Sequence, residues 1–228
     1  MASLTAGTRI SRSTPGRRHP VGERRTGWED TALRMLEFVA YPALAGCALL
    51  LLCLGVVTWL PALAAAAYAL QQWRDDGRGR PFLGTLEAFG RYWRRLWRHA
   101  LLSTVAGAVL AANVVFLATR TGAAALALLA LQIGLVLAAV PYHLALAVTA
   151  ARNPGGDVRR WSRGALLFAF ASPRRGLGLL GVAVAAPVLT APLAFGPLLL
   201  GGTLPLLVGL RLADRPRPCT PPDRKRKP

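Results

Sequence analysis

Four long stretches of the chain contain no acidic residue, lysine or arginine, and this feature limits the possible folds more than any other. They cover residues 38–73, 100–119, 121–151 and 176–210, together 122 of 228 residues. A helix on the surface of a soluble domain must present a polar face to water, so a soluble domain of this size cannot hide four such stretches. The sequence predicts an all-α polytopic membrane bundle. It excludes an ordinary soluble enzyme, a disulfide-linked secreted scaffold and a disordered chain.

The charged residues gather between these stretches and are mostly basic. The chain carries 28 Lys and Arg against 10 Asp and Glu, a formal net charge of +18. All basic residues except Arg120 fall in four blocks, at 1–37, 74–99, 152–175 and 211–228. Such a charge suggests nucleic acid as the partner of a soluble protein. Here every block adjoins an apolar stretch, so we interpret it as the signal that keeps basic loops in the cytoplasm, and we expect no nucleic-acid partner.

The charge distribution also predicts a topology. If the first and last apolar stretches each crossed the membrane once, two basic blocks would lie outside the cell. If both stretches turn back, all four blocks lie on one side. A full crossing over 38–60 would end at Pro61, which cannot continue the helical hydrogen bonds, and a short second leg over 62–73 would return. Prolines allow the last stretch to turn as well, namely Pro187, Pro192 and Pro197.

We therefore expect five or six membrane-embedded segments in the plasma membrane, with both termini in the cytoplasm. The helical membrane domain is predicted to cover residues 35–211. A disordered basic arm (1–34) precedes it, and a disordered tail rich in Pro, Arg and Lys (212–228) follows it. The stretch 121–151 is longer than one crossing needs. We expect the part after Pro141 to bend along the interface or to project from it.

Two of the basic segments have amphipathic patterns. In 82–99 the apolar residues recur every three or four positions, and Glu87, Arg91, Arg94 and Arg98 follow the same steps on the opposite face. The apolar positions are Phe82, Leu86, Phe89, Trp93 and Leu96. We expect this helix to lie flat among the lipid headgroups, with packing on its own bundle as the alternative. The second segment, 158–172, places Trp161, Ala165 and Phe168 on one stripe and ends before Pro173.

These two segments supply the residues that we predict to contact a partner or anionic lipid. They are Arg91, Trp93, Arg94, Arg95, Trp97, Arg98, Arg159, Arg160 and Trp161.

Few residues inside the apolar stretches could support chemistry. Asn113, Gln132 and His143 are the polar candidates, and the amides are expected to form hydrogen bonds between helices, with substrate contact as the alternative. Ser103 has no histidine that the sequence can pair with it at membrane depth. The spacing of the cysteines and histidines predicts no metal site, and we expect no cofactor and no catalytic residue.

Three stretches resemble the YesL-like family of bacterial integral membrane proteins, a domain family without an established function. The first runs from Val57 through Pro61 to Trp73, and it is similar to the family's T-x-x-P-A-x-x-A-L-Y motif. The second, Pro81–Arg95, resembles the basic helix before the family's second span, although Gly90 and Tyr92 depart from the F-R-x-N pattern. The third is Trp161–Pro173. The resemblance implies an association with carbohydrate ABC-type uptake systems.

Three functions are compatible with these patterns. The first is a non-catalytic accessory component of such an uptake system, acting through the two basic segments. The second is a permease subunit of the transporter itself, for which Glu87-Ala88-Phe89-Gly90 is a weak match to a cytoplasmic coupling loop. The third is an enzyme acting on lipid, which no acid–base pair in the sequence supports. The expected partners are anionic lipids and ABC transporter components; the sequence leaves the oligomeric state open.

Overall fold

The computed structural model describes residues 27–77 and 80–214, and within these ranges the chain forms eight helices and no strand. The all-α prediction is confirmed. The helices are α1 (Gly27–Cys53), α2 (Trp59–Asp76), α3 (Pro81–Ala118), α4 (Ala123–Arg152), α5 (Val158–Phe170), α6 (Pro173–Thr190), α7 (Gly196–Leu200) and α8 (Thr203–Asp214).

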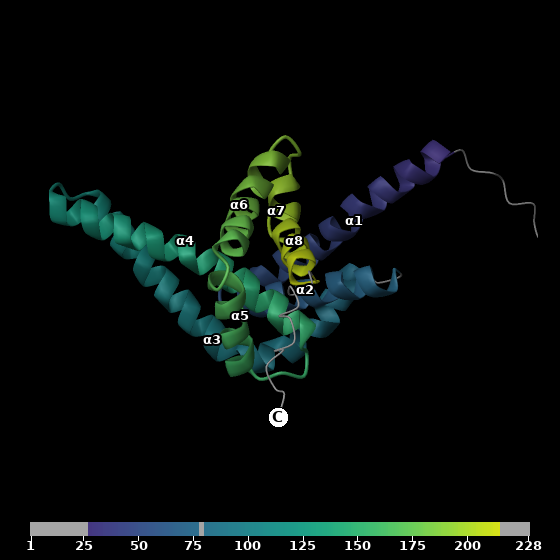
Figure 1. The fold of residues 1–228 in the computed structure, drawn as a ribbon, viewed down its shortest axis with the longest axis horizontal. Coiled ribbons are helices and arrows are strands. Elements are labelled where there is room, and N and C mark those ends of the chain that lie inside the picture. Colours follow the sequence, from purple (N-terminus) through teal and green to yellow (C-terminus); the bar gives the residue numbers. More distant parts are fainter. Residues whose placement is uncertain (1–26, 78–79, 215–228) are drawn as a thin grey trace, which may run out of the picture.

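Three helical arms spread from a common base (Figure 1). One arm is α1, the second is the hairpin of α3 and α4, and the third contains α6, α7 and α8. The base contains α2, α5 and the adjoining ends of α3 and α4, with the α4–α5 loop at its lower edge in this view. Below, "the base" means this end of the molecule and "the arms" mean the helices that leave it.

Several segments are long and apolar enough to cross a membrane. They are Thr31–Cys53, Pro81–Ala118, Ala123–Arg152 and Gly196–Asp214. A fifth span results if α5 and α6, which meet at 93°, are counted as one bent segment. These helices fit a multi-pass membrane protein. The second leg that we expected after the first span is α2, which does not meet the same criteria within the described residues because charged residues occupy its last turn.

Helix α2 forms the centre of the protein core. Its residues from Ala64 to Ala67 are fully buried, as are Leu60 and Leu70, and α1, α3, α4 and α8 pack around it. Alanine side chains allow neighbouring backbones to approach closely, which increases the van der Waals contact between helices. The alanine run after Pro61 therefore explains why a helix with modest hydropathy occupies the most buried position.

The break in the first apolar stretch occurs before Pro61, and the predicted helix break at Pro61 is wrong in position. Helix α1 ends at Cys53, and the hydroxyl of Thr58 donates hydrogen bonds to the backbone carbonyls of Leu52 and Gly55 in the intervening turn. Pro61 is the third residue of α2. In the first turn of a helix the backbone N–H groups have no carbonyl partner, so a proline there removes no hydrogen bond.

Helix α3 joins two elements that we predicted to be separate. The expected flat helix over 82–99 and the span over 100–119 form one continuous helix of 38 residues, about 57 Å long at 1.5 Å per residue. Its first half packs on α2, as the bundle-packing alternative stated. The buried stripe also differs from the predicted one: Leu86 is exposed, and the buried positions are Pro81, Thr85, Ala88, Tyr92, Leu96 and Ala100.

The later apolar stretches follow the prediction in part. Helix α4 continues through Pro141, and the part after this proline is the most buried part of the helix, so it neither projects nor lies along an interface. The last stretch turns back between α6 and α7, as expected, with Pro192 in the turn and Pro197 at the start of α7. Pro187 lies inside α6.

The helices extend beyond both predicted boundaries of the membrane domain, residues 35 and 211. Helix α1 begins at Gly27, eight residues before the expected boundary, and α8 ends at Asp214. A carboxylate oxygen of Asp214 lies 2.5 Å from a guanidinium nitrogen of Arg74, and its other oxygen lies 3.6 Å from one of Arg152. These ion pairs hold the end of α8 against α2 and α4. The predicted arm up to residue 26 and the tail from residue 215 lie outside the described residues.

Candidate functional site

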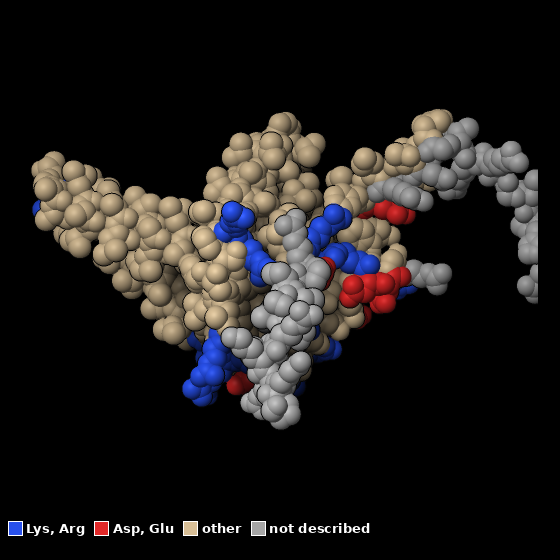
Figure 2. Space-filling model, in the orientation of Figure 1, with Lys and Arg blue, Asp and Glu red and all other residues tan. Residues whose placement is uncertain are grey.

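Basic side chains gather at the base and where the third arm joins it, whereas the hairpin of α3 and α4 beyond the base shows almost no charge (Figure 2). We define the basic surface as those exposed residues of α3 and α5, among the ones that sequence analysis singled out, whose side chains do not bond to the α4–α5 loop: Arg91, Arg94, Trp97, Arg98, Arg159 and Arg160. Arg120 lies far from them, in the turn between α3 and α4. The arrangement separates an apolar region from a cationic end, as expected for a protein whose basic loops lie at one membrane surface.

No arginine of the basic surface forms an ion pair in the described part of the chain, although the exposed acidic residues Glu87 and Asp157 lie nearby on α3 and at the start of α5. The two ion pairs found in the described ranges both involve Asp214, whose carboxylate pairs with the guanidinium groups of Arg74 and Arg152. The guanidinium of Arg91 lies 5.6 Å from the ring centroid of Tyr68, and that of Arg98 lies 5.3 Å from the ring of Trp97. These cation–π contacts orient the arginines and do not neutralise their charge. The surface therefore favours an anionic partner.

Two predicted contact residues stabilise the base instead. Trp161 is only 1% exposed, and its indole N–H donates to the carbonyl of Asn153 at 2.9 Å. One guanidinium nitrogen of Arg95 donates to the carbonyls of Pro154 and Gly156, at 2.9 Å each. Both side chains hold the α4–α5 loop. The prediction that Trp161 contacts lipid or a partner is wrong, because the apolar stripe of α5 faces the core.

Trp93 has an intermediate position. It is partly buried, and its ring stacks on that of Phe89 with the centroids 5.9 Å apart. This pair covers one side of the first half of α3, and the arginines remain on the other.

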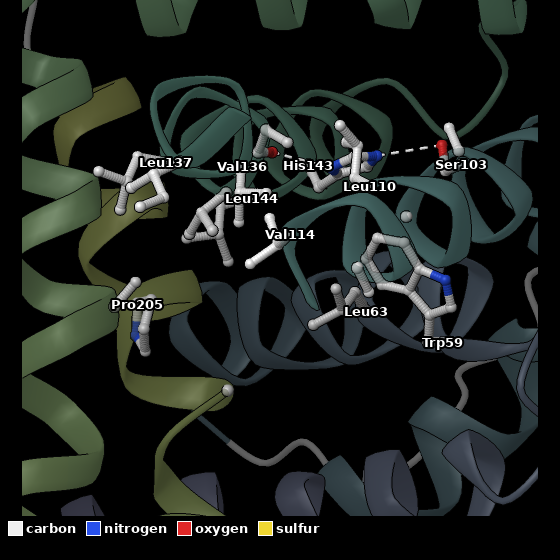
Figure 3. A pocket seen from close by; sticks show the side chains of 18 of the residues that line it. Trp59, Leu63, Ser103, Leu110, Val114, Val136, Leu137, His143, Leu144 and Pro205 are labelled. Atoms are coloured by element: carbon white, nitrogen blue, oxygen red, sulfur yellow. Dashed lines mark hydrogen bonds between the residues drawn. The ribbon is translucent and has the colours of Figure 1, made fainter. Parts of the chain in front are cut away.

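A large apolar cavity lies between the arms, directly beyond the base (Figure 3). Its volume is about 890 Å³. Residues of α2, α3, α4, α6 and α8, together with the α7–α8 connection, line it, and most of them are aliphatic. Trp59 and Leu63 of α2 lie at one side, Leu110 and Val114 come from α3, and Leu144 comes from α4. A cavity of this size and lining is suited to an apolar ligand.

A serine–histidine pair lies at the wall of this cavity. The hydroxyl oxygen of Ser103 is 3.1 Å from Nε2 of His143, and Nδ1 of His143 is 2.8 Å from the carbonyl oxygen of Ala139 (Figure 3). A carbonyl only accepts hydrogen bonds, so Nδ1 carries the proton of the neutral ring and Nε2 accepts from the Ser103 hydroxyl. The expectation that Ser103 lacks a histidine partner is wrong, because the α3–α4 hairpin joins residues 40 positions apart.

Two further polar pairs lie close to Ser103 and connect the same helices. The indole N–H of Trp59 donates to the hydroxyl of Thr104 at 3.0 Å, and the hydroxyl of Tyr142 lies 3.2 Å from Nε2 of His99. Trp59 also lines the cavity, so its ring faces the interior of the bundle. The three pairs fix α2, α3 and α4 relative to one another where the arms leave the base.

The remaining polar candidates lie in the hairpin. Asn113 is exposed, and Gln132 is partly buried with a buried side-chain oxygen that has no hydrogen-bond partner. Neither amide forms the predicted bond between helices among the described residues. Cys47 and Cys53 are free thiols, and no group of three or more metal-ligating side chains occurs in the described ranges.

Comparison with protein-family models, curated proteins and solved structures found no match for this chain. The resemblance to the YesL-like family therefore stays a prediction.

Proposed function

We propose that the protein is a non-catalytic accessory component of a membrane assembly in the plasma membrane, which it contacts through the basic surface. The observation that carries this proposal is the excess of exposed, unpaired arginines on that surface. Its arginines are exposed on two helices of the base, and no acidic side chain pairs with them in the described ranges. Charges of one sign on a rigid surface attract and orient a partner of opposite charge.

The base suits such a contact because it is rigid. The fully buried aromatic Tyr92 donates a hydrogen bond to the carbonyl of Ala150 at 3.2 Å, and Trp161 packs against the ring of Tyr92 with the centroids 6.0 Å apart. Helices α3 and α5 therefore hold their arginines in a fixed arrangement. A rigid surface loses less conformational entropy on binding than a flexible one. Anionic lipid headgroups and an acidic face of a partner protein both fit this chemistry.

The resemblance to the YesL-like family supports a more specific assignment. Carbohydrate ABC-type uptake systems are the partners that this resemblance implies. Placement of the basic surface and of the end of α8 in the cytoplasm follows from the basic blocks of the sequence and belongs to the same proposal. Helix α1 begins at the end of its arm that lies away from the base (Figure 1), so the expected cytoplasmic N-terminus does not fit this placement when α1 crosses the membrane. The cytoplasmic side is also where the ATPase subunits of such systems bind.

The accessory role predicts a charge-dependent complex. We expect transporter subunits to co-purify with the wild-type protein from membranes of its source organism in mild detergent. Replacement of two arginines of the basic surface, Arg94→Glu and Arg98→Glu together, should reduce their recovery by about tenfold, because repulsion replaces attraction (about 1.4 kcal/mol). Quantitative mass spectrometry of the purified complexes measures the recovery.

Arg120→Glu is the matched control, since it reverses a charge in the turn at the other end of α3. It should leave recovery unchanged. If wild-type protein retains no transporter subunit, or if the double variant retains as much as the control, the accessory role is wrong.

A further inference from the structure

We propose that the cavity between the arms binds an aliphatic lipid with a free hydroxyl group, such as a long-chain alcohol or a monoacylglycerol. This site is separate from the basic surface and from the accessory role proposed above. The aliphatic wall of the cavity selects an aliphatic chain, and Ser103 selects the hydroxyl group.

The lining accounts for the chain. Leu63, Leu110, Val114, Leu137 and Leu144 contribute branched aliphatic side chains from three helices to the wall. Burying an aliphatic chain against them is favourable by about 25 cal/mol per Å² of apolar area removed from water. A charged or strongly hydrated ligand would lose its hydration here without replacement by hydrogen bonds.

The hydrogen bonds of Ser103 and His143 account for the hydroxyl. Nδ1 of His143 donates to Ala139, and Nε2 accepts the proton of Ser103, so both ring nitrogens are occupied. The Ser103 oxygen retains the capacity to accept a second hydrogen bond, because a hydroxyl oxygen has two lone pairs. The indole N–H of Trp59 is already donated to Thr104. The pair therefore offers an acceptor to the cavity, and a ligand hydroxyl supplies the matching donor.

The position of Ser103 gives the ligand a direction. Ser103 follows Arg98 of the basic surface by five residues, about 7.5 Å along α3, and Val114 lies a further 11 residues toward the hairpin turn, about 16 Å. The acceptor thus lies at the end of the cavity near the base, and the aliphatic wall extends away from it. An amphiphile bound in this direction has its polar end toward the basic surface, as a lipid in the adjoining leaflet does.

Photoaffinity labelling tests the site in the full-length protein. The probe is octadecan-1-ol with a diazirine at mid-chain, added to protein in nanodiscs of phosphatidylcholine. Irradiation should label α3 and α4 residues of the cavity wall. Unlabelled octadecan-1-ol should suppress this labelling at a concentration about tenfold lower than its methyl ether, which has the same chain but cannot donate a hydrogen bond.

Three variants complete the experiment. Ser103→Ala combined with His143→Phe should abolish the preference for the alcohol over the ether, because together they remove the Ser103 oxygen and Nε2 of His143, which the loss of Ser103 alone would free as an acceptor. Gly107→Phe should abolish the labelling, since Gly107 lines the cavity and an added Cβ atom there meets nothing within 4 Å, so the ring can enter the cavity. Gly134→Phe is the matched control, a glycine of the same hairpin with equally open space but outside the cavity lining. It should label as the wild type does.

Equal competition by alcohol and ether in the wild type would overturn the proposal and show that bulk lipid chains merely fill the space. Undiminished labelling of Gly107→Phe would also overturn it. Should Gly107→Phe fail to fold, the alcohol-to-ether ratio of the variant with Ser103→Ala and His143→Phe decides, because these substitutions remove the polar atoms of the pair and add little bulk to the cavity wall. The labelling results do not depend on the arginines of the basic surface. The lipid-binding proposal and the accessory role can therefore be refuted separately.

Discussion

Replacement of Trp161 by alanine is expected to destabilise the folded protein by about 3–5 kcal/mol, more than any other single substitution in the base. Trp161 is the largest fully buried side chain, and it packs against the ring of Tyr92. Its removal leaves a cavity in the core cluster shared by α2, α3, α4 and α5, and it removes one of the two donors to the carbonyl of Asn153, which keeps only the backbone N–H of Gly156. Unfolding by a graded increase of sodium dodecyl sulfate in mixed micelles, followed by circular dichroism, measures the loss.

Trp97→Ala provides the matched control. Trp97 is also a tryptophan of the base, but it is 41% exposed, so its truncation should cost much less. If Trp161→Ala and Trp97→Ala shift the unfolding midpoint equally, Trp161 is not the anchor of the α4–α5 loop, and the described packing of the base is wrong.

Gly46→Ala should have the second-largest effect on stability. A Cβ atom at this position would lie 1.9 Å from the carbonyl oxygen of Leu199, so α1 and α7 cannot keep their present separation. Because the obstacle is backbone, it cannot rotate away as a side chain would. Overpacking of this kind costs about 1–3 kcal/mol. The same detergent titration should show a lower unfolding midpoint.

The control for Gly46 is Gly181→Ala in α6, where an added Cβ atom meets nothing within 4 Å. Alanine has a higher helix propensity than glycine, so this variant should be as stable as the wild type or slightly more stable. A Gly46→Ala protein with unchanged stability would contradict the close contact between α1 and the third arm.

The sequence predicted the elements better than their packing. The charge-free stretches predicted the apolar arms, and prolines in 176–210 predicted the turn between α6 and α7, because both depend on local chemistry. The location of the first break could not be predicted from Pro61 alone, since a proline interrupts a helix interior but is compatible with a helix start. The sequence did not indicate the hydrogen bonds of the Thr58 hydroxyl, which hold the turn before α2.

The candidate sites show the same division. Exposed arginines such as Arg94 were predicted from the spacing of charges along one helix. The stripe of Trp161 was also visible, but its direction was misjudged, because an apolar stripe faces lipid or core equally well. The hydrogen bond between Ser103 and His143 depends on how α3 and α4 are aligned in the hairpin. No local sequence pattern predicts that alignment. A search for polar residues facing each other across the predicted hairpin would have found this pair.

The central claim is that the arms lie in the lipid and the base lies at the cytoplasmic surface. Single cysteines introduced by Arg120→Cys, Gly155→Cys and Val109→Cys, in a protein whose native cysteines are replaced by alanine, test it directly. We predict that a membrane-impermeant maleimide labels the cysteine at position 120 in intact cells and labels the one at position 155 only after the membrane is opened. Labelling at position 155 in intact cells would contradict the orientation, and labelling along the hairpin at position 109 would contradict its burial in lipid.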